Sequence, residues 1–228
     1  NSLCAMPDEV LEAIEIINKY GRYVGYNGLP YFLPGINFVI GLKGESKQTF
    51  EENFEFLQEV VRRNLLLRRI NIRQVKIFPG TPMEKEGYRT LIRHKRYFRI
   101  FKKRVREEVD NPMLQKILPK GRKLTDLRCE VEGKVTYARQ LATYPILVGL
   151  IGRYKRNTVL DARIVDYGYR SVTAIETPLN VNTASVDQLR SLLKNKAAEI
   201  IAKRPFESLD EVRRILKDFQ DLESYLTV

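Results

Sequence analysis

Basic side chains recur at helical spacing between positions 96 and 106, and the chemistry open to them is phosphate binding. A helix is expected over residues 90–109, and one face of it would carry Arg96, Arg99, Lys103 and Arg106. The opposite face would carry Leu91, Phe98, Phe101, Val105 and Val109. Cations bind phosphate oxygens, and the neighbouring Tyr97 and Ile100 would add contacts to bases. A solvated helix face is the commoner role of a charge run, but hardly any acid interrupts this stripe, which favours a nucleic-acid contact.

The positive charge of the chain is concentrated around this stripe. The 228 residues include 40 Lys and Arg against 28 Asp and Glu, a net charge of +12. Residues 84–124 hold 14 basic and 5 acidic residues, which is +9 of that total. We therefore expect anionic partners. A membrane is not expected among them, because no run approaches the roughly 18 apolar residues of a membrane helix.

Composition excludes several other classes of protein. Apolar residues make up 43% of the chain, which is enough to build folded cores. Cys4 and Cys129 are too few for a disulfide framework or a four-ligand zinc site, so no metal is expected from this chain alone. No charged and apolar signal stretch opens the sequence, so a cytoplasmic location is expected.

For one histidine and two cysteines, a structural role is the favoured interpretation. His94 falls among apolar residues of the basic helix, and without visible partners it is expected to be a buried structural histidine rather than a catalyst. Cys4 and Cys129 are expected to be small buried hydrophobic residues rather than reactive thiols.

The first part of the chain alternates helix and strand. Helices are expected over residues 6–21 and after Ser46, and strands over residues 36–40 and 70–78, an order that implies a parallel sheet. The buried face of the second helix would consist of Phe50, Phe54, Leu57 and Val61. The polar residues of the second strand would face either a site in the barrel interior, or a neighbouring helix or solvent, and they are Asn71, Arg73, Gln74 and Lys76.

The remaining segments have two further patterns. The basic helix is expected to end at Asn111-Pro112, since a residue before proline avoids the helical region. Residues 122–178 are rich in Val, Thr and Tyr with spaced glycines, which predicts a small antiparallel β domain, TRAM- or OB-like. Residues 179–228 are expected to be helical, with capping boxes at Ser185 and Ser208.

Residues 1–85 resemble the C-terminal half of a radical S-adenosylmethionine (SAM) barrel. The resemblance lies in the segment 38–45, Phe-Val-Ile-Gly-Leu-Lys-Gly-Glu, and in the segment 75–82, Val-Lys-Ile-Phe-Pro-Gly-Thr-Pro, although Lys43 stands where the family usually has proline. It implies that the loop of the first segment lies beside the adenosyl group of SAM and that the strand ending in the second segment closes the partial barrel. The implied cofactor-binding residues are Gly41, Gly44, Glu45, Ile77, Phe78 and Pro79. On local grounds alone Glu45 would instead cap the helix that follows it.

One feature of that family is absent. Its members hold a [4Fe–4S] cluster through a Cys-x3-Cys-x2-Cys loop, and neither cysteine of this chain belongs to such a triplet. Either the cluster-bearing half precedes Asn1, which the missing initial Met favours, or the chemistry has been lost. No cofactor is expected to bind tightly to this chain alone.

The last fifty residues resemble a helix-hairpin-helix module of the DNA-uptake-receptor type. The match lies in the segments 179–189 and 197–206. A glycine-rich hairpin should follow Leu192, but only the segment 193–196 stands there. Either the hairpin is truly deleted, or its residues are disordered and therefore absent from this sequence. Lys194 and Lys196 in that segment are candidate nucleic-acid contacts. Residues 122–178 resemble, less specifically, the TRAM-type β-barrel of some tRNA-modifying radical SAM enzymes.

The predicted fold class is α/β. It begins with the C-terminal half of a partial (β/α)6 TIM-like barrel at 1–88 and a basic helical connector at 89–121. A small β-barrel-like domain at 122–178 and an all-α helix-hairpin-helix domain at 179–228 follow.

The leading hypothesis for function is a piece of a radical SAM iron–sulfur enzyme that modifies tRNA or DNA, inactive without its cluster half. The alternative is a non-catalytic nucleic-acid-binding protein that uses the half barrel as a scaffold. A third hypothesis is a small-molecule radical enzyme whose added modules contact proteins. A homodimer covering the open sheet edge would indicate a remnant of a larger fold, whereas a monomer with a capped edge would favour the scaffold.

Overall fold

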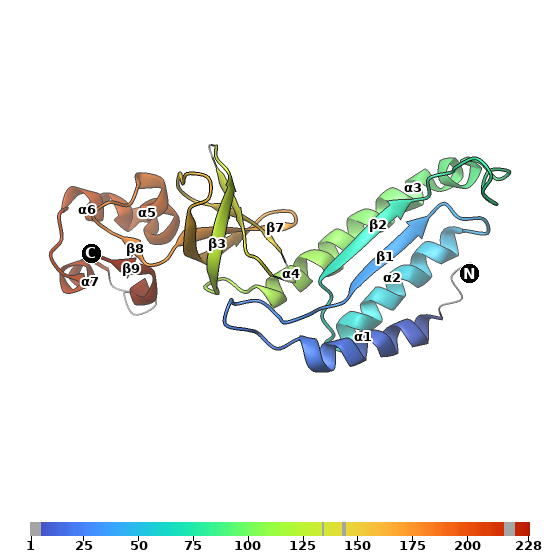
Figure 1. Ribbon diagram of the computed structural model, residues 1–228, viewed down its shortest axis with the longest axis horizontal. Coiled ribbons are helices and arrows are strands. Elements are labelled where there is room, and N and C mark those ends of the chain that lie inside the picture. Colours follow the sequence, from blue (N-terminus) through green and yellow to red (C-terminus); the bar gives the residue numbers. More distant parts are fainter. Residues whose placement is uncertain (1–5, 134, 143–144, 217–221) are drawn as a thin grey trace. The chain divides into compact units, whose positions relative to one another are not determined.

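The computed structural model describes residues 6–133, 135–142, 145–216 and 222–228. The chain is mixed α/β and forms two compact units (Figure 1). The first unit comprises residues up to Tyr23 together with Pro30–Ile117. The second comprises Val24–Leu29 and Leu118–Val228. Most of the segment predicted as a separate connector, residues 89–117, therefore belongs to the first unit.

The first unit is a two-stranded parallel sheet with helices packed against it (Figure 1). Its elements follow the predicted order as α1 (Pro7–Gly21), β1 (Gly35–Ile40), α2 (Lys47–Arg62), β2 (Arg69–Gln74) and α3 (Arg89–Arg104). The strands pair in register, with Ile36 beside Ile70 and Phe38 beside Ile72. β2 ends at Gln74 instead of Phe78, although the Val75 N–H still donates to the Ile40 carbonyl at 2.8 Å.

An aromatic and aliphatic core holds α2 and α3 on the sheet. The Phe101 ring of α3 lies edge-on to Phe38 of β1 and Phe50 of α2, with centroids 5.6 and 5.8 Å away. Phe50, Phe54 and Leu57 are buried as predicted. Val61, however, is 45% exposed, and Val60 is fully buried in its place, because the stripe on α2 continues from Leu57 by three residues rather than four.

The basic helix was predicted to end at Asn111-Pro112, and this prediction was wrong. α3 continues through a π-helical turn, η1 (Val105–Asp110), into α4 (Asn111–Ile117). Asn111 has helical angles, φ −68° and ψ −48°, and its N–H donates to the carbonyl of Arg106, five residues earlier. The wider π turn accommodates a proline that lacks an N–H and whose ring would crowd a regular α-helical turn.

The second unit contains a closed five-stranded β-barrel (Figure 1). Its strands are β3 (Lys123–Val131), β4 (Thr136–Arg139), β5 (Leu147–Leu150), β6 (Val159–Tyr167) and β7 (Ser171–Glu176). They are ordered β3-β4-β5-β7-β6, and β6 closes on β3. The prediction of an all-antiparallel domain was wrong at one pair, because β5 and β7 run parallel.

Short helices follow the barrel in the same unit. They are α5 (Val186–Leu193), the 3-10 turn η2 (Lys194–Lys196), α6 (Ala197–Ala202), α7 (Leu209–Ile215) and the 3-10 turn η3 (Glu223–Tyr225). β8 (Leu179–Asn180) pairs in parallel with β9 (Leu226–Thr227), which ties the two ends of this segment together. Their shared core includes the fully buried Leu189, Ile200 and Val212.

The capping box predicted at Ser185 is confirmed. The Ser185 N–H donates to Gln188 Oε1 at 2.9 Å, and the Gln188 N–H donates to Ser185 Oγ at 3.3 Å. At Ser208 the reciprocal pair is not formed, because the Glu211 carboxylate accepts from the Glu207 N–H, one residue earlier. None of the helices described is long and apolar enough to cross a membrane.

Candidate nucleic-acid interface

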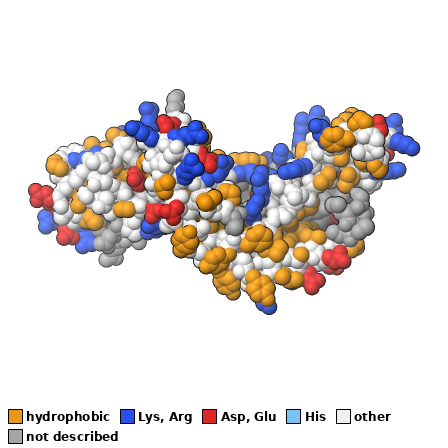
Figure 2. Space-filling model, in the orientation of Figure 1, with side chains coloured by type: hydrophobic (Ala, Val, Ile, Leu, Met, Phe, Trp, Pro, Cys, Tyr) orange, Lys and Arg blue, Asp and Glu red, His pale blue; other side chains and the backbone are white. Residues whose placement is uncertain are grey.

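The outward face of α3 carries the basic stripe that the sequence predicts. Arg96, Arg99 and Lys103 are all exposed, and further exposed cations flank them, namely Arg89, Arg93, Lys95 and Lys102. Lys and Arg side chains project from the surface in the region of this helix (Figure 2). Ile92 lies among them and is 74% exposed, so the surface offers an apolar side chain as well as charge.

Few acids neutralise this surface. Lys103 lies 4.0 Å from Glu107, at the limit of an ion pair, while Arg104 pairs with Glu51 and Glu108 at 3.2 and 3.3 Å. Within the described ranges, Arg96 and Arg99 have no acidic partner. A ridge of cations with free donors attracts a polyanion, and binding to it should weaken as salt rises.

Arg106 does not belong to this ridge, and its prediction as a nucleic-acid contact was wrong. The residue is 4% exposed, and its guanidinium pairs with the Asp110 carboxylate one turn later. The π turn that begins at Val105 breaks the regular 3.6-residue spacing on which the predicted stripe depended. Arg106 therefore has a structural role inside the first unit.

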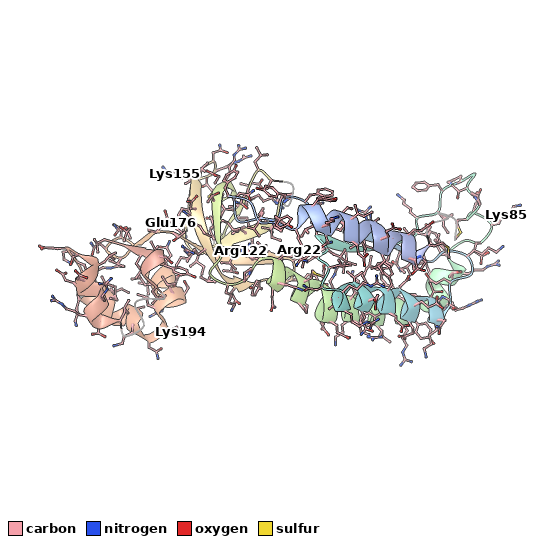
Figure 3. All side chains as sticks on the ribbon, turned by 90° about the horizontal axis from the view of Figure 1, so that it is seen from below. Arg22, Lys85, Arg122, Lys155, Glu176 and Lys194 are labelled. Atoms are coloured by element: carbon pink, nitrogen blue, oxygen red, sulfur yellow. The ribbon has the colours of Figure 1, made fainter. Side chains whose placement is uncertain are left out.

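The two candidate lysines near the C-terminus lie in the η2 turn between α5 and α6. Both are exposed (Figure 3 labels Lys194). Lys196 forms an ion pair with Glu199 at 2.9 Å, so part of its charge is already compensated. Lys194 has a φ of +50° with a ψ of −121°, a conformation that suits glycine and strains a residue with a side chain.

Substituting Lys194 with glycine is expected to stabilise the second unit by about 1 kcal/mol. Relief of backbone strain, of order 1–3 kcal/mol, should exceed the extra flexibility that glycine gives the unfolded chain. Urea unfolding followed by circular dichroism measures this change. Lys196→Gly is the matched control, because it removes the same charge at a regular helical position, φ −78°, and should destabilise. A loss of stability in Lys194→Gly would contradict the expectation.

The two loops that the radical SAM resemblance implicates leave neighbouring strands at the same edge of the sheet. Gly41 and Gly44 follow β1 with φ values of +99° and +85°. A Cβ on Gly41 would lie 2.3 Å from Leu91 Cδ2 and 3.1 Å from Val75 Cγ1, so glycine is required where the loop passes these side chains. The carboxyl edge of adjacent parallel strands is where ligands commonly bind in α/β folds.

The Glu45 side chain stabilises the loop that contains it. Its Oε2 accepts from the Gly41 N–H at 2.7 Å, and its Oε1 lies 3.4 Å from Nδ1 of His94 on α3. The Glu45 side chain is only 3% exposed, and it does not cap α2. His94 is buried against Phe50 and Tyr97, as expected of a structural histidine.

The second loop is more open. The Ile77 N–H donates to the Tyr88 hydroxyl at 3.5 Å, whereas Phe78 and Pro79 are exposed. Among the polar residues near β2, the side chains of Arg73, Gln74 and Lys76 are exposed, and Asn71 Nδ2 donates to Asn37 Oδ1 at 2.9 Å on the same sheet face. The loops bring Gly41 close to Val75, but Glu45 turns away from solvent and Phe78 turns toward it.

The residues of this chain do not fit a [4Fe–4S] cluster. Cys129 is fully buried within the barrel, and burial raises the pKa of its thiol, which disfavours the thiolate that iron requires. Cys4 lies outside the described residues. Among the residues described, no three His, Cys, Asp or Glu side chains are grouped to hold a metal ion.

Two adjoining cavities in the second unit were not predicted. The smaller, of about 320 Å³, lies against β4, β5 and β7 and is lined in part by Val135, Tyr137 and Gly149. The larger, of about 540 Å³, is lined in part by Tyr154, Glu176 and Gln188. Reasoning from local sequence could not find these cavities, because their lining comes from distant segments.

No family model matches the chain. It is 67% identical over 215 residues to an uncharacterized protein of Archaeoglobus fulgidus, a match that covers 94% of this chain and 41% of that protein. It is 46% identical over 176 residues to an uncharacterized protein of Methanocaldococcus jannaschii, covering 76% of this chain and 32% of that protein. The chain thus spans about two fifths and one third of the lengths of these curated relatives.

Proposed function

We propose that this chain is the C-terminal part of a radical SAM iron–sulfur enzyme that acts on a nucleic acid, either tRNA or DNA. The observation that carries the nucleic-acid part is the ridge on α3. Its cations are exposed, and Arg96 and Arg99 have no acidic partner in the described parts of the chain. Long-range attraction of phosphates needs such unneutralised charge.

The enzymatic part of the proposal is supported by the first unit. Its strands are parallel and adjacent, and the glycine-bearing loops after β1 and β2 leave the same edge of the sheet. Among the described residues each strand pairs only with the other, so neither outer edge of the sheet is paired with a further strand. The curated relatives are more than twice as long as the matched part, which leaves length for a cluster-bearing half.

The second unit supports delivery of a nucleic-acid substrate. Counted from β3, its strands are ordered 1-2-3-5-4 around a closed barrel, an arrangement we interpret as OB-like and therefore compatible with a TRAM-type domain. We interpret α5, η2 and α6 as a helix-hairpin-helix whose turn holds Lys194 in place of glycine. SAM and the cluster would supply a radical when bound, and this chain would bind and orient the substrate.

The nucleic-acid proposal is tested by titrating the chain with labelled single-stranded and hairpin RNA and with DNA. We expect binding that weakens steeply between about 50 and 200 mM salt, because cations on the protein release counterions from the nucleic acid. Absence of binding at the lowest salt would refute it.

The enzymatic proposal is tested separately on the full-length relative from Archaeoglobus fulgidus, reconstituted with iron and sulfide without oxygen. SAM cleavage is the expected result. If the relative has no three-cysteine loop and does not cleave SAM, the enzymatic proposal fails. The scaffold alternative, a nucleic-acid-binding protein without catalysis, then remains.

A further inference from the structure

The two cavities of the second unit form one groove. Gly152 and Asp187 line both cavities, so the spaces adjoin at these two residues. A Cβ on Gly152 would lie 2.8 Å from Gln188 Nε2 and 2.9 Å from the Tyr154 ring, and its φ is +127°. Glycine is therefore needed at the junction, where a larger residue would displace the side chains beside it.

One end of the groove is a flat aromatic surface. Tyr137 on β4 is 38% exposed and lies directly across the ladder from Gly149 on β5, which in turn pairs with Thr173 on β7. Gly149 has no side chain, so the ring of Tyr137 has no bulky cross-strand neighbour there. An exposed ring of this kind is a stacking platform for a nucleobase.

The other end presents the Glu176 carboxylate, which a hydrogen-bonded network holds in place. The Tyr154 hydroxyl donates to Glu176 Oε2 at 2.9 Å and accepts from Gln188 Nε2 at 2.9 Å (Figure 3 labels Glu176). Gln188 Oε1 is occupied by the N–H and hydroxyl of Ser185 at 2.9 and 2.8 Å. Burial and the Glu176 charge strongly raise the pKa of Tyr154, so the phenol stays protonated and keeps donating to Glu176.

This network fixes what a ligand at that end must offer. With Oε2 of Glu176 engaged by Tyr154, the free acceptors are its Oε1 and the exposed carboxylate of Asp187. An ionised carboxylate only accepts hydrogen bonds, so the ligand must donate. Arg153 lines the same cavity and is followed by the exposed Lys155 and Arg156, which suit a phosphate beside the donor group.

We propose that this groove binds a single strand of nucleic acid, with one base stacked on Tyr137 and another read through its donor edge by Glu176 and Asp187. Guanine is the base that fits best, because its N1–H and N2 amino groups are adjacent donors. The inference rests on the proposed nucleic-acid function and adds a base preference to it. A small organic cation is the competing occupant of the carboxylate end, but it would use neither Tyr137 nor Arg153.

The test measures fluorescence anisotropy of the chain with labelled uridine hexamers that carry a single G, A or C, and with their DNA counterparts. The wild type is expected to bind the G-containing hexamer about tenfold more tightly than the A-containing one. Glu176→Gln combined with Asp187→Asn should abolish this preference, so that the G- and A-containing hexamers bind equally. Tyr137→Ala should weaken binding of every hexamer about tenfold.

Tyr20→Ala is the matched control, because Tyr20 is 68% exposed on α1 and belongs to the other unit. Thermal melting of each variant shows whether the fold is retained. Wild-type binding with no base preference, or a Tyr137→Ala variant that binds normally, would overturn the groove and leave the α3 ridge as the contact. If the wild type binds no nucleic acid at all, the proposed function itself fails. Binding of spermidine to the chain without nucleic acid, lost in Glu176→Gln but kept in Tyr137→Ala, would assign the site to a cation.

Discussion

Reversing the charge of Arg96, Arg99 and Lys103 to glutamate is expected to weaken binding to RNA or DNA about a hundredfold near 0.1 M salt. Each residue is exposed on α3, and the three lie on one face of the helix. If each contacts one phosphate, the slope of log affinity against log salt should fall by about 3, since each contact contributes about 0.9. Filter binding at four salt concentrations measures both quantities.

The control for this result must change the same net charge elsewhere on the first unit. Lys19→Glu, Arg22→Glu and Lys47→Glu meet this need, because all three residues are exposed outside α3 (Figure 3 labels Arg22). If only the overall charge of the protein matters, both triple variants should lose nucleic-acid affinity equally. If α3 is the contact surface, the α3 variant should lose much more affinity than the control. Unchanged affinity of the α3 variant would exclude the ridge as the binding surface.

The parts of the fold that could be predicted are those that depend on local pattern. The apolar residues before Gly41 predict β1, although alternate residues of this strand are exposed rather than buried on both faces. The spacing of Phe50, Phe54 and Leu57 predicts α2, because a half-buried helix imposes this period on the sequence. The Ser185–Gln188 capping box was also readable, since it joins residues three positions apart.

The parts that could not be predicted depend on contacts between distant segments or on irregular backbone. The parallel pairing of β5 with β7 leaves no mark on either strand taken alone. The groove joins Tyr137, Tyr154, Glu176 and Gln188 across some fifty positions, and each looks like an ordinary surface polar residue in the sequence. Arg106 was misplaced because a regular helical period was assumed through a π turn.

Replacing Arg106 with alanine is expected to cost the first unit about 3–5 kcal/mol of stability. The side chains of Arg106 and Asp110 are only 5% and 15% exposed, so removing the guanidinium takes this ion pair away from a largely buried carboxylate next to the π turn. Breaking a buried ion pair by removing one member is penalised by this much, because water cannot fully replace the lost interaction. Urea unfolding, followed through the transition of the first unit, measures the change.

Two further variants distinguish the loss of the buried ion pair from the loss of a cation on the exposed face of the helix. Lys103→Ala disrupts only an exposed pair with Glu107 at 4.0 Å and should cost less than about 1 kcal/mol. Arg106→Met with Asp110→Leu removes both charges of this pair and should recover most of the lost stability, since apolar residues of similar volume can replace a buried ion pair. Below its unfolding transition, Arg106→Ala should keep the wild-type salt dependence of nucleic-acid binding. A variant that stays as stable as Lys103→Ala, or that loses affinity while folded, would return Arg106 to the binding surface.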